Sequence, residues 1–136
     1  MSGLERFGKF SLVGILGAAL QVSLFHLLIG YPHIPAAAAS AIAVEIVVLH
    51  NFLWNERFTW SSRRNVSQRQ RAIRLWRFHL GNGLVSMVGN TLLTFCFVDQ
   101  LHAPPVPSAV AAIAVCAPVN FLIADRWVYT AQPWPV

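Results

Sequence analysis

The chain has 136 residues, of which 56% are hydrophobic and only 11% are charged, and its mean hydropathy is +0.55. A soluble domain of this size needs more polar residues to cover its surface, so the composition excludes that class and indicates an integral membrane protein. The net charge of +5 would suit nucleic acid, but no recognition motif accompanies it, and we expect no nucleic-acid partner.

Four apolar segments follow one another along the chain, and each is long enough to cross the hydrocarbon core of a bilayer as a helix. The predicted spans are residues 10–29, 36–55, 78–98 and 108–128. Proline-rich turns at residues 30–35 and 99–107 join the first span to the second and the third to the fourth.

The loop over residues 56–77 separates the second span from the third and carries most of the arginines. Within it, Ser67 and Gln70 have the spacing of a capping box. This spacing predicts a short helix over about residues 68–77 that runs into the third span.

Charge is distributed unevenly among the loops. All ten Lys and Arg residues lie at the N-terminus, in loop 56–77 or at the end of the fourth span. Positively charged loops remain in the cytoplasm, so both termini and the central loop are predicted to be cytoplasmic. The predicted fold class is therefore an all-α membrane protein with four transmembrane helices.

The two halves of the sequence resemble each other. With an offset of 69 residues, Asn51, Phe52 and Arg57 correspond to Asn120, Phe121 and Arg126. Near the start of each half the offset is 68, which pairs Lys9 and Phe10 with Arg77 and Phe78. We predict one four-helix membrane domain over residues 1–136, built from helix hairpins at about 7–60 and 76–129. Because each repeat has an even number of spans, the two repeats have parallel topology.

Small residues predict where helices touch. The alanines of the second span are expected to face the first span, which offers Gly14 and Ala18 in return. In the third span, small and polar residues at three- and four-residue spacing predict a stripe that faces protein or water. These residues are Gly83, Ser86, Asn90 and Thr94. Cys96 and Cys116 fall at different depths of their spans, so we expect free thiols.

Polar residues inside the spans are the first candidates for function. Glu45 lies near the middle of the second span, where a charge costs roughly 2.5–3.5 kcal/mol. Proton coupling or contact with a polar substrate would justify that cost, and the alternative is a protonated Glu45 bonded to Gln21 or Asn90. Gln21 and Asn90 correspond in the two halves, and either interhelical hydrogen bonding or substrate contact would explain them.

A second group of candidates lies at the predicted cytoplasmic ends of the spans. Asn51 and Asn55 share a helical face, and Asn120 and Asp125 occupy the matching depth in the fourth span. Arginines follow both pairs and could bind phosphate through paired hydrogen bonds, or could serve only as orientation signals. The candidate substrate-binding residues are thus Gln21, Glu45, Asn51, Asn55, Arg57, Asn90, Asn120, Asp125 and Arg126.

No catalytic triad, metal-binding spacing or glycine-rich phosphate loop is present in the sequence. We therefore expect no enzyme activity and no cofactor. A small proton-coupled exporter would also have four spans and one buried Glu. However, some exporters of that kind insert in both orientations, which requires a weak charge bias, whereas the bias here is complete.

The opening residues 6–14, the four-span layout and the paired endings at residues 51–60 and 120–129 resemble the GtrA family. The resemblance implies a multi-pass protein of the bacterial inner membrane that translocates a polyprenyl-phosphate-linked sugar for cell-surface polysaccharide or glycan modification. It implies as an alternative a membrane scaffold for a polyprenyl-phosphate glycosyltransferase, without transport. The implied partners are that glycolipid, membrane lipids and a glycosyltransferase, and association into a homo-oligomer stays open.

Overall fold

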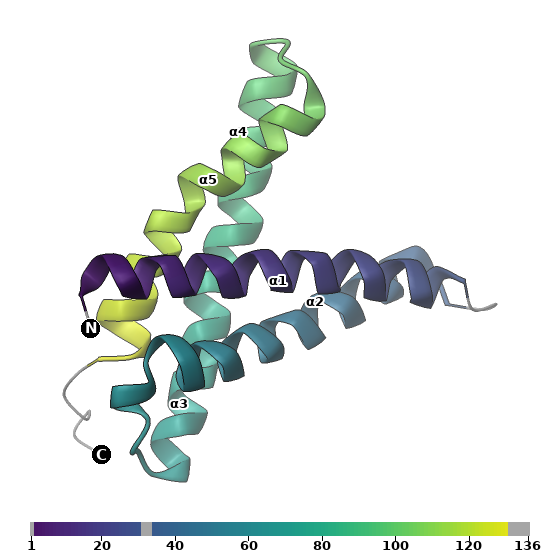
Figure 1. Ribbon diagram of the computed structural model, residues 1–136. Coiled ribbons are helices and arrows are strands. Elements are labelled where there is room, and N and C mark those ends of the chain that lie inside the picture. The colour runs from purple at the N-terminus through teal and green to yellow at the C-terminus, as the bar shows by residue number, and fades with distance from the viewer. Residues whose placement is uncertain (1, 31–33, 131–136) are drawn as a thin grey trace. The chain divides into compact units, whose positions relative to one another are not determined.

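The computed structural model describes residues 2–30 and 34–130, and the described chain is almost entirely helical (Figure 1). The α-helices are α1 (Gly3–Ile29), α2 (Ala36–Trp54), α3 (Gln68–Phe78), α4 (Asn90–Phe95) and α5 (Pro105–Ile123). Short π-helical segments continue them, namely η1 (Asn55–Thr59), η3 (His79–Gly83), η4 (Val85–Gly89), η5 (Cys96–Gln100) and η6 (Ala124–Val128). A single 3-10 turn, η2 (Ser61–Arg63), follows η1.

Four stretches of helix are long and apolar enough to cross a membrane, which confirms the predicted number of spans. They are Gly3–Ile29, Ala38–Thr59, Gln68–Gln100 and Val110–Val128. The first begins earlier than residue 10 because Ser2 caps it. The Ser2 hydroxyl accepts a hydrogen bond from the Glu5 amide at 3.2 Å, and the Glu5 carboxylate accepts one from the Ser2 amide at 2.8 Å.

The chain divides into two compact units, residues 1–64 and 65–136, and the boundary between them in the sequence falls within the basic loop. Unit 1 is the antiparallel hairpin of α1 and α2, drawn in purple and blue in Figure 1. Ala39 and Ala43 of α2 are fully buried in it, which confirms the predicted contact face of the alanines. Residues 31–33 of the predicted turn lie outside the described chain.

The prediction for the opposing face of α1 was wrong. Gly14 and Ala18 are exposed, and a Cβ added at Gly14 would meet nothing within 4 Å. The buried positions of α1 are Val13 and Gly17 instead. The contact passes through Gly17 because the Asn51 side chain lies directly against it, and only glycine leaves room for that amide.

Unit 2 is the second antiparallel hairpin. Ser67 and Gln70 form the predicted capping box at the start of α3, and the helix continues through η3 and η4 into α4 before α5 returns beside it (Figure 1). Two glycines make the close contacts with α5. A Cβ at Gly81 would lie 2.6 Å from Ile123 Cγ2, and one at Gly89 would lie 2.8 Å from Cys116 Sγ.

The two units make matching contacts. In each hairpin, these contacts lie at the end where the basic residues are found. In unit 1 the rings of Phe10 and Trp60 meet edge to face at 5.9 Å, and Lys9 Nζ lies 4.6 Å from the centre of the Phe58 ring. The Trp60 amide donates to the carbonyl of Asn55, the first residue of η1, at 2.8 Å.

Unit 2 has the corresponding set of contacts at the positions that the sequence offsets assign. Phe78 and Tyr129 meet edge to face at 6.3 Å, and the Arg77 guanidinium lies 5.6 Å from the centre of the Trp127 ring. The Tyr129 amide donates to the Ala124 carbonyl at 2.8 Å. The resemblance between the halves therefore extends from residue identity to the packing of aromatic and cationic side chains.

The change of offset between the halves has a structural counterpart. The offset is 68 at Phe10 and Phe78 but 69 at Gly14 and Gly83, so the second half contains one additional residue between Phe78 and Gly83. In the structure η3 occupies this interval, whereas α1 is α-helical throughout. A π-helical turn closes a hydrogen bond over one more residue than an α-helical turn, so η3 accommodates the additional residue.

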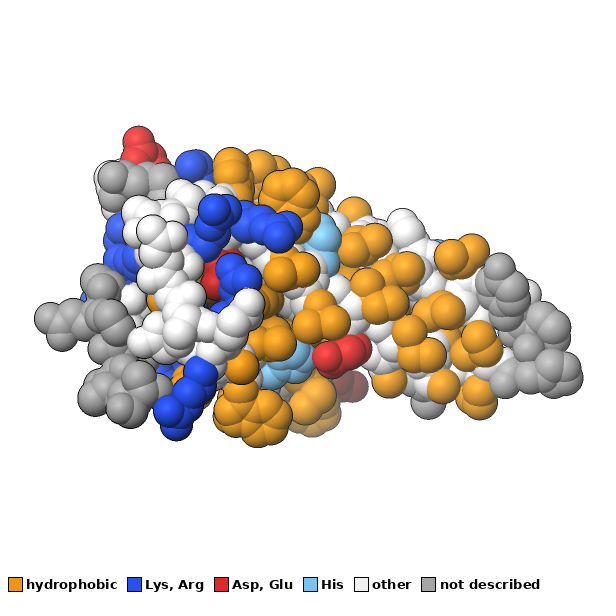
Figure 2. Space-filling model, turned by 90° about the horizontal axis from the view of Figure 1, so that it is seen from below, with side chains coloured by type: hydrophobic (Ala, Val, Ile, Leu, Met, Phe, Trp, Pro, Cys, Tyr) orange, Lys and Arg blue, Asp and Glu red, His pale blue; other side chains and the backbone are white. Residues whose placement is uncertain are grey.

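Large apolar side chains are exposed along all four spans, and Figure 2 shows hydrophobic side chains over the middle and right of the face that it draws. Examples are Ile15, Leu27, Met87 and Ile113, all more than half exposed. Such a surface suits hydrocarbon and not water. Cys96 is exposed and Cys116 is buried, and both are free thiols, as predicted.

Candidate functional site

Polar side chains in unit 1 follow one face from η1 into α2. Thr59 Oγ1 donates to Asn55 Oδ1 at 2.8 Å, and both residues are buried. Two turns before Thr59, the Asn51 amide lies against Gly17, with His50 Nδ1 3.2 Å from Asn51 Oδ1. The predicted pairing of Asn51 and Asn55 on one face is thus part of a longer polar row.

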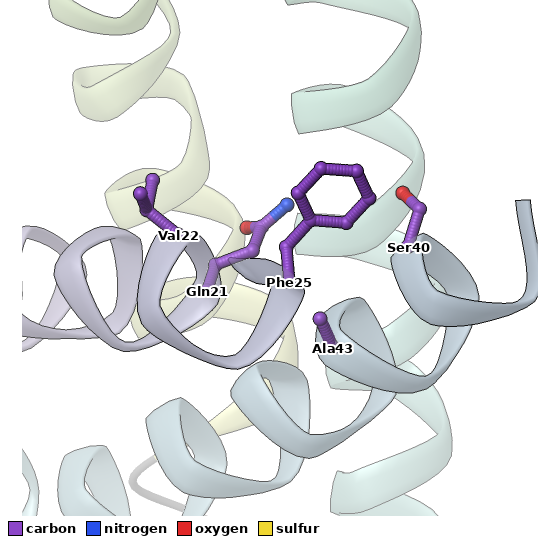
Figure 3. A pocket seen from close by; sticks show the side chains of 5 residues that line it. All are labelled: Gln21, Val22, Phe25, Ser40 and Ala43. Atoms are coloured by element: carbon purple, nitrogen blue, oxygen red, sulfur yellow. The ribbon is translucent and has the colours of Figure 1, made fainter. Parts of the chain in front are cut away.

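The polar row of unit 1 continues on α1, where Gln21 lies one turn beyond Gly17. Gln21 lines a pocket of about 240 Å³ together with Val22, Phe25, Ser40 and Ala43. In the view of Figure 3 the Phe25 ring lies between the Gln21 amide and the Ser40 hydroxyl. The pocket is mainly apolar with two hydrogen-bonding groups, a combination that suits a polar group on a lipid.

Glu45 is not part of this pocket. It is exposed, whereas Ala43 and Val47, two residues to either side of it, are buried. Because successive residues of an α-helix are about 100° apart, Glu45 lies on the far side of α2 from these two residues. The structure therefore does not bring Glu45 into the polar row or the Gln21 pocket.

Unit 2 brings Asn120 and Ser86 together. Asn120 Nδ2 of α5 donates to Ser86 Oγ of η4 at 2.8 Å. By the offset of 69 residues, this pair corresponds to Asn51 and Gly17 in unit 1. Asn90 lies one turn beyond Ser86, and its Oδ1 is buried without a hydrogen-bond partner among the described residues. The side chain of Thr94, the last residue of the predicted stripe, lies outside the described part of the structure.

The basic end of each unit exposes one candidate arginine. Arg57 in η1 and Arg126 in η6 are both exposed, and Asp125 beside Arg126 is partly buried. Arg74 is different, because only 8% of it is exposed and its guanidinium lies over the Tyr129 ring at 5.8 Å. Arg57 and Arg126 can therefore meet an anionic group from outside the helices, whereas Arg74 is held within unit 2.

Sequence reasoning did not select five of the polar residues that the structure buries, namely Glu56, Thr59, Arg74, Asn82 and Ser108. Glu56 is only 1% exposed and was not a candidate, although its counterpart Asp125 was. The alignment of the halves contained the signal that would have found it. Asn82 is 8% exposed and lies between two glycines of η3. Its position inside an apolar span was a signal that the predicted stripe did not use.

Comparison with known proteins agrees with this architecture. Residues 9–129 match the family described as "GtrA/DPMS, transmembrane domain". A dolichol-phosphate mannosyltransferase of Pyrococcus furiosus is 29% identical over 100 residues, which are 74% of this chain and 28% of that protein. The chain thus matches little more than a quarter of the length of that protein. Four apolar helices and the match over nearly the whole sequence show that the chain is a multi-pass membrane protein of the GtrA/DPMS transmembrane-domain family.

Proposed function

We propose that the chain translocates a polyprenyl-phosphate-linked sugar across the bacterial inner membrane for cell-surface polysaccharide or glycan modification. The observation that carries the proposal is the polar row of unit 1, from Thr59 through Asn55 and Asn51 to the Gln21 pocket. Moving one hydroxyl into hydrocarbon without a hydrogen-bond partner costs roughly 2–7 kcal/mol. A sugar with several hydroxyls therefore needs such a row, while its isoprenoid tail stays in lipid.

The candidate residues divide by chemistry. Arg57 in unit 1 and Arg126 in unit 2 are each suited to bind a phosphate, because guanidinium groups pair with its oxygens and both side chains are exposed. The sugar is bound at the ends of the spans that carry the arginines, by the asparagine amides and the Asp125 carboxylate. These asparagines are Asn51, Asn55 and Asn120. Gln21 and Asn90 contact the sugar deeper in their spans. Glu45 contacts the sugar from outside the helix pair or carries a proton. The chain itself catalyses no reaction, and a separate glycosyltransferase makes or uses the glycolipid.

One observation favours a second function, a membrane scaffold for a glycosyltransferase without transport. The relative from Pyrococcus furiosus is named a mannosyltransferase, and its match to this chain covers only 28% of its length. A segment like this chain is therefore one part of a longer transferase in that organism. In this protein, such a segment would hold a glycosyltransferase at the membrane, alone or as a homo-oligomer.

A flip assay in proteoliposomes tests the first function. Purified protein is reconstituted with a labelled polyprenyl-phosphate sugar, and the exposure of the head group to an external probe is followed over time. We expect faster exchange with wild type and slower exchange with Glu45→Gln and Asn51→Ala. Ser23→Ala is the matched control, because among the described residues its hydroxyl bonds only to the Ala19 carbonyl of its own helix, at 2.9 Å.

Unchanged exchange in both variants would lead us to abandon the translocation mechanism. No acceleration by wild type with several candidate sugars would favour the scaffold instead. Deleting the chain should then release a glycosyltransferase from the membrane fraction.

A further inference from the structure

Unit 2 contains an amide that the proposed function has not used. Asn82 is 92% buried, and within the described residues neither its Oδ1 nor its Nδ2 has a hydrogen-bond partner. Leaving a buried amide unpaired costs about 1–3 kcal/mol. An apolar residue of similar size would avoid that cost, so a purely structural role does not explain asparagine at this position.

Asn82 belongs to a row of polar side chains with Ser86 and Asn90. In a regular α-helix two steps of four residues would turn Asn90 about 80° away from Asn82. Asn82 and Ser86, however, lie in the π-helical segments η3 and η4, and Asn90 follows them directly. Because a π-helical turn contains more residues than an α-helical turn, these segments counter that rotation.

The unpaired atoms of this row define what it can bind. Asn82 Oδ1, Asn90 Oδ1 and Asn120 Oδ1 are buried acceptors without partners in the described part of the chain, and Asn82 Nδ2 is an unused donor. Asn120 joins the row from α5 through its hydrogen bond to Ser86. Acceptors predominate, so a phosphate, which only accepts hydrogen bonds, does not suit the row, whereas hydroxyl groups both donate and accept.

Unit 1 keeps only two of these four polar residues, since Gln21 and Asn51 correspond to Asn90 and Asn120. By the offset of 69 residues, Asn82 corresponds to Val13 and Ser86 to Gly17, and both residues of unit 1 are buried. The polar pair Asn82 and Ser86 is therefore a property of unit 2 and not a general requirement for packing two helices of this kind together.

We propose that Asn82, Ser86, Asn90 and Asn120 form a transit site for the hydroxyl groups of the sugar, separate from the arginines that hold the phosphate. This inference rests on the proposed function. Because the unpaired amide atoms are shielded, the sugar must displace neighbouring side chains to reach them. The site is therefore occupied during passage and affects the rate of translocation.

The test compares Asn82→Leu with wild type in proteoliposomes containing a labelled polyprenyl-phosphate sugar. We expect exchange to slow about fivefold for each hydrogen bond lost, since a typical hydrogen bond contributes about 1 kcal/mol. The melting temperature of the variant should stay the same or rise, because an unpaired buried amide has been removed. Ser108→Ala is the control, since Ser108 is buried in the same unit but bonds to the Pro104 carbonyl at 2.8 Å.

A second measurement separates this inference from the proposed function. The glycolipid should raise the melting temperature of wild type more than sugar-free polyprenyl phosphate does, and Asn82→Leu should lose that difference. If wild type fails to flip the glycolipid but shows this sugar-dependent shift, the function is wrong and the site stands. Unchanged exchange and an unchanged shift in Asn82→Leu would overturn the site while leaving the function intact. A lowered melting temperature in Asn82→Leu without added lipid would also overturn it, because Asn82 would then be structural.

Discussion

Gly81→Ala should destabilise unit 2, whereas Gly83→Ala, two residues further along, should not. A Cβ at Gly81 would lie 2.6 Å from Ile123 Cγ2 and 3.3 Å from the Trp127 ring, while one at Gly83 would meet nothing within 4 Å. Ile123 cannot move aside cheaply, because a β-branched side chain in a helix has one strongly preferred rotamer. Trp127 is constrained as well, by the Arg77 guanidinium over its ring.

The difference between these two variants isolates the steric cost. Adding a methylene to a packed interior costs about 1–3 kcal/mol, while replacing glycine by alanine inside a helix gains about 0.8–1.0 kcal/mol. Gly81→Ala should therefore lower the free energy of unfolding by about 0–2 kcal/mol. Gly83→Ala should raise it by up to about 1 kcal/mol. The gain in helix propensity is common to both, so they should differ by about 1–3 kcal/mol.

Reversible unfolding in mixed detergent micelles, followed by the fluorescence of the five tryptophans, measures both variants against wild type. If the two substitutions change the unfolding free energy by the same amount and in the same direction, the close contact of Gly81 with α5 does not stabilise unit 2. The conclusion that Gly81 lies in the helix contact would then be refuted.

Three further predictions use other contacts. Thr59→Val should cost about 1–3 kcal/mol of unfolding free energy, because the buried Asn55 amide oxygen loses its hydroxyl donor. The control Thr91→Val, at an exposed position, should change the unfolding free energy by less than about 0.5 kcal/mol. Equal effects of the two variants in denaturation would contradict the buried bond. Ser86→Ala should lower the unfolding free energy by about 0.6 kcal/mol, the contribution of a typical interhelical hydrogen bond in a membrane. This effect should vanish in the Asn120→Leu background, where the donor to Ser86 is already absent. A membrane-permeable maleimide should label Cys96 in the folded protein but Cys116 only after unfolding. Mass spectrometry of single Cys→Ser variants measures the labelling of each thiol, and labelling of Cys116 before Cys96 would contradict the prediction.

Features that depend on a few neighbouring residues could be predicted from the sequence. The capping box of Ser67 and Gln70 is local, and the four spans follow from length and hydropathy alone. Asn51 and Asn120 could be found because both halves keep an asparagine at the same position, and in each unit it contacts the first helix of the hairpin.

Features that depend on how two helices meet could not be predicted in the same way. Gly14 and Gly17 are both small residues on α1, and sequence spacing does not decide which one faces α2. The choice depends on the rotation of the helix, which the fit of the Asn51 amide against Gly17 fixes. Gly81 and Gly89, and not Gly83, make the close contacts of unit 2 for the same reason. Asn82 and Glu56 were missed because burial, and not residue type, distinguishes them from other polar residues.

The additional residue at η3 affects how sequences of this kind are aligned. An insertion inside a regular helix would turn every later side chain by about 100° and move the contact face towards lipid. Here the wider turn absorbs it, and Ser86 still meets Asn120 as Gly17 meets Asn51. An alignment that forbids gaps within predicted spans would therefore place residues before η3 one position out of register, and would pair Arg77 with Gly8 in place of Lys9. Gap placement inside a span is thus structural information, and one-residue length differences between related chains should be sought at π-helical turns.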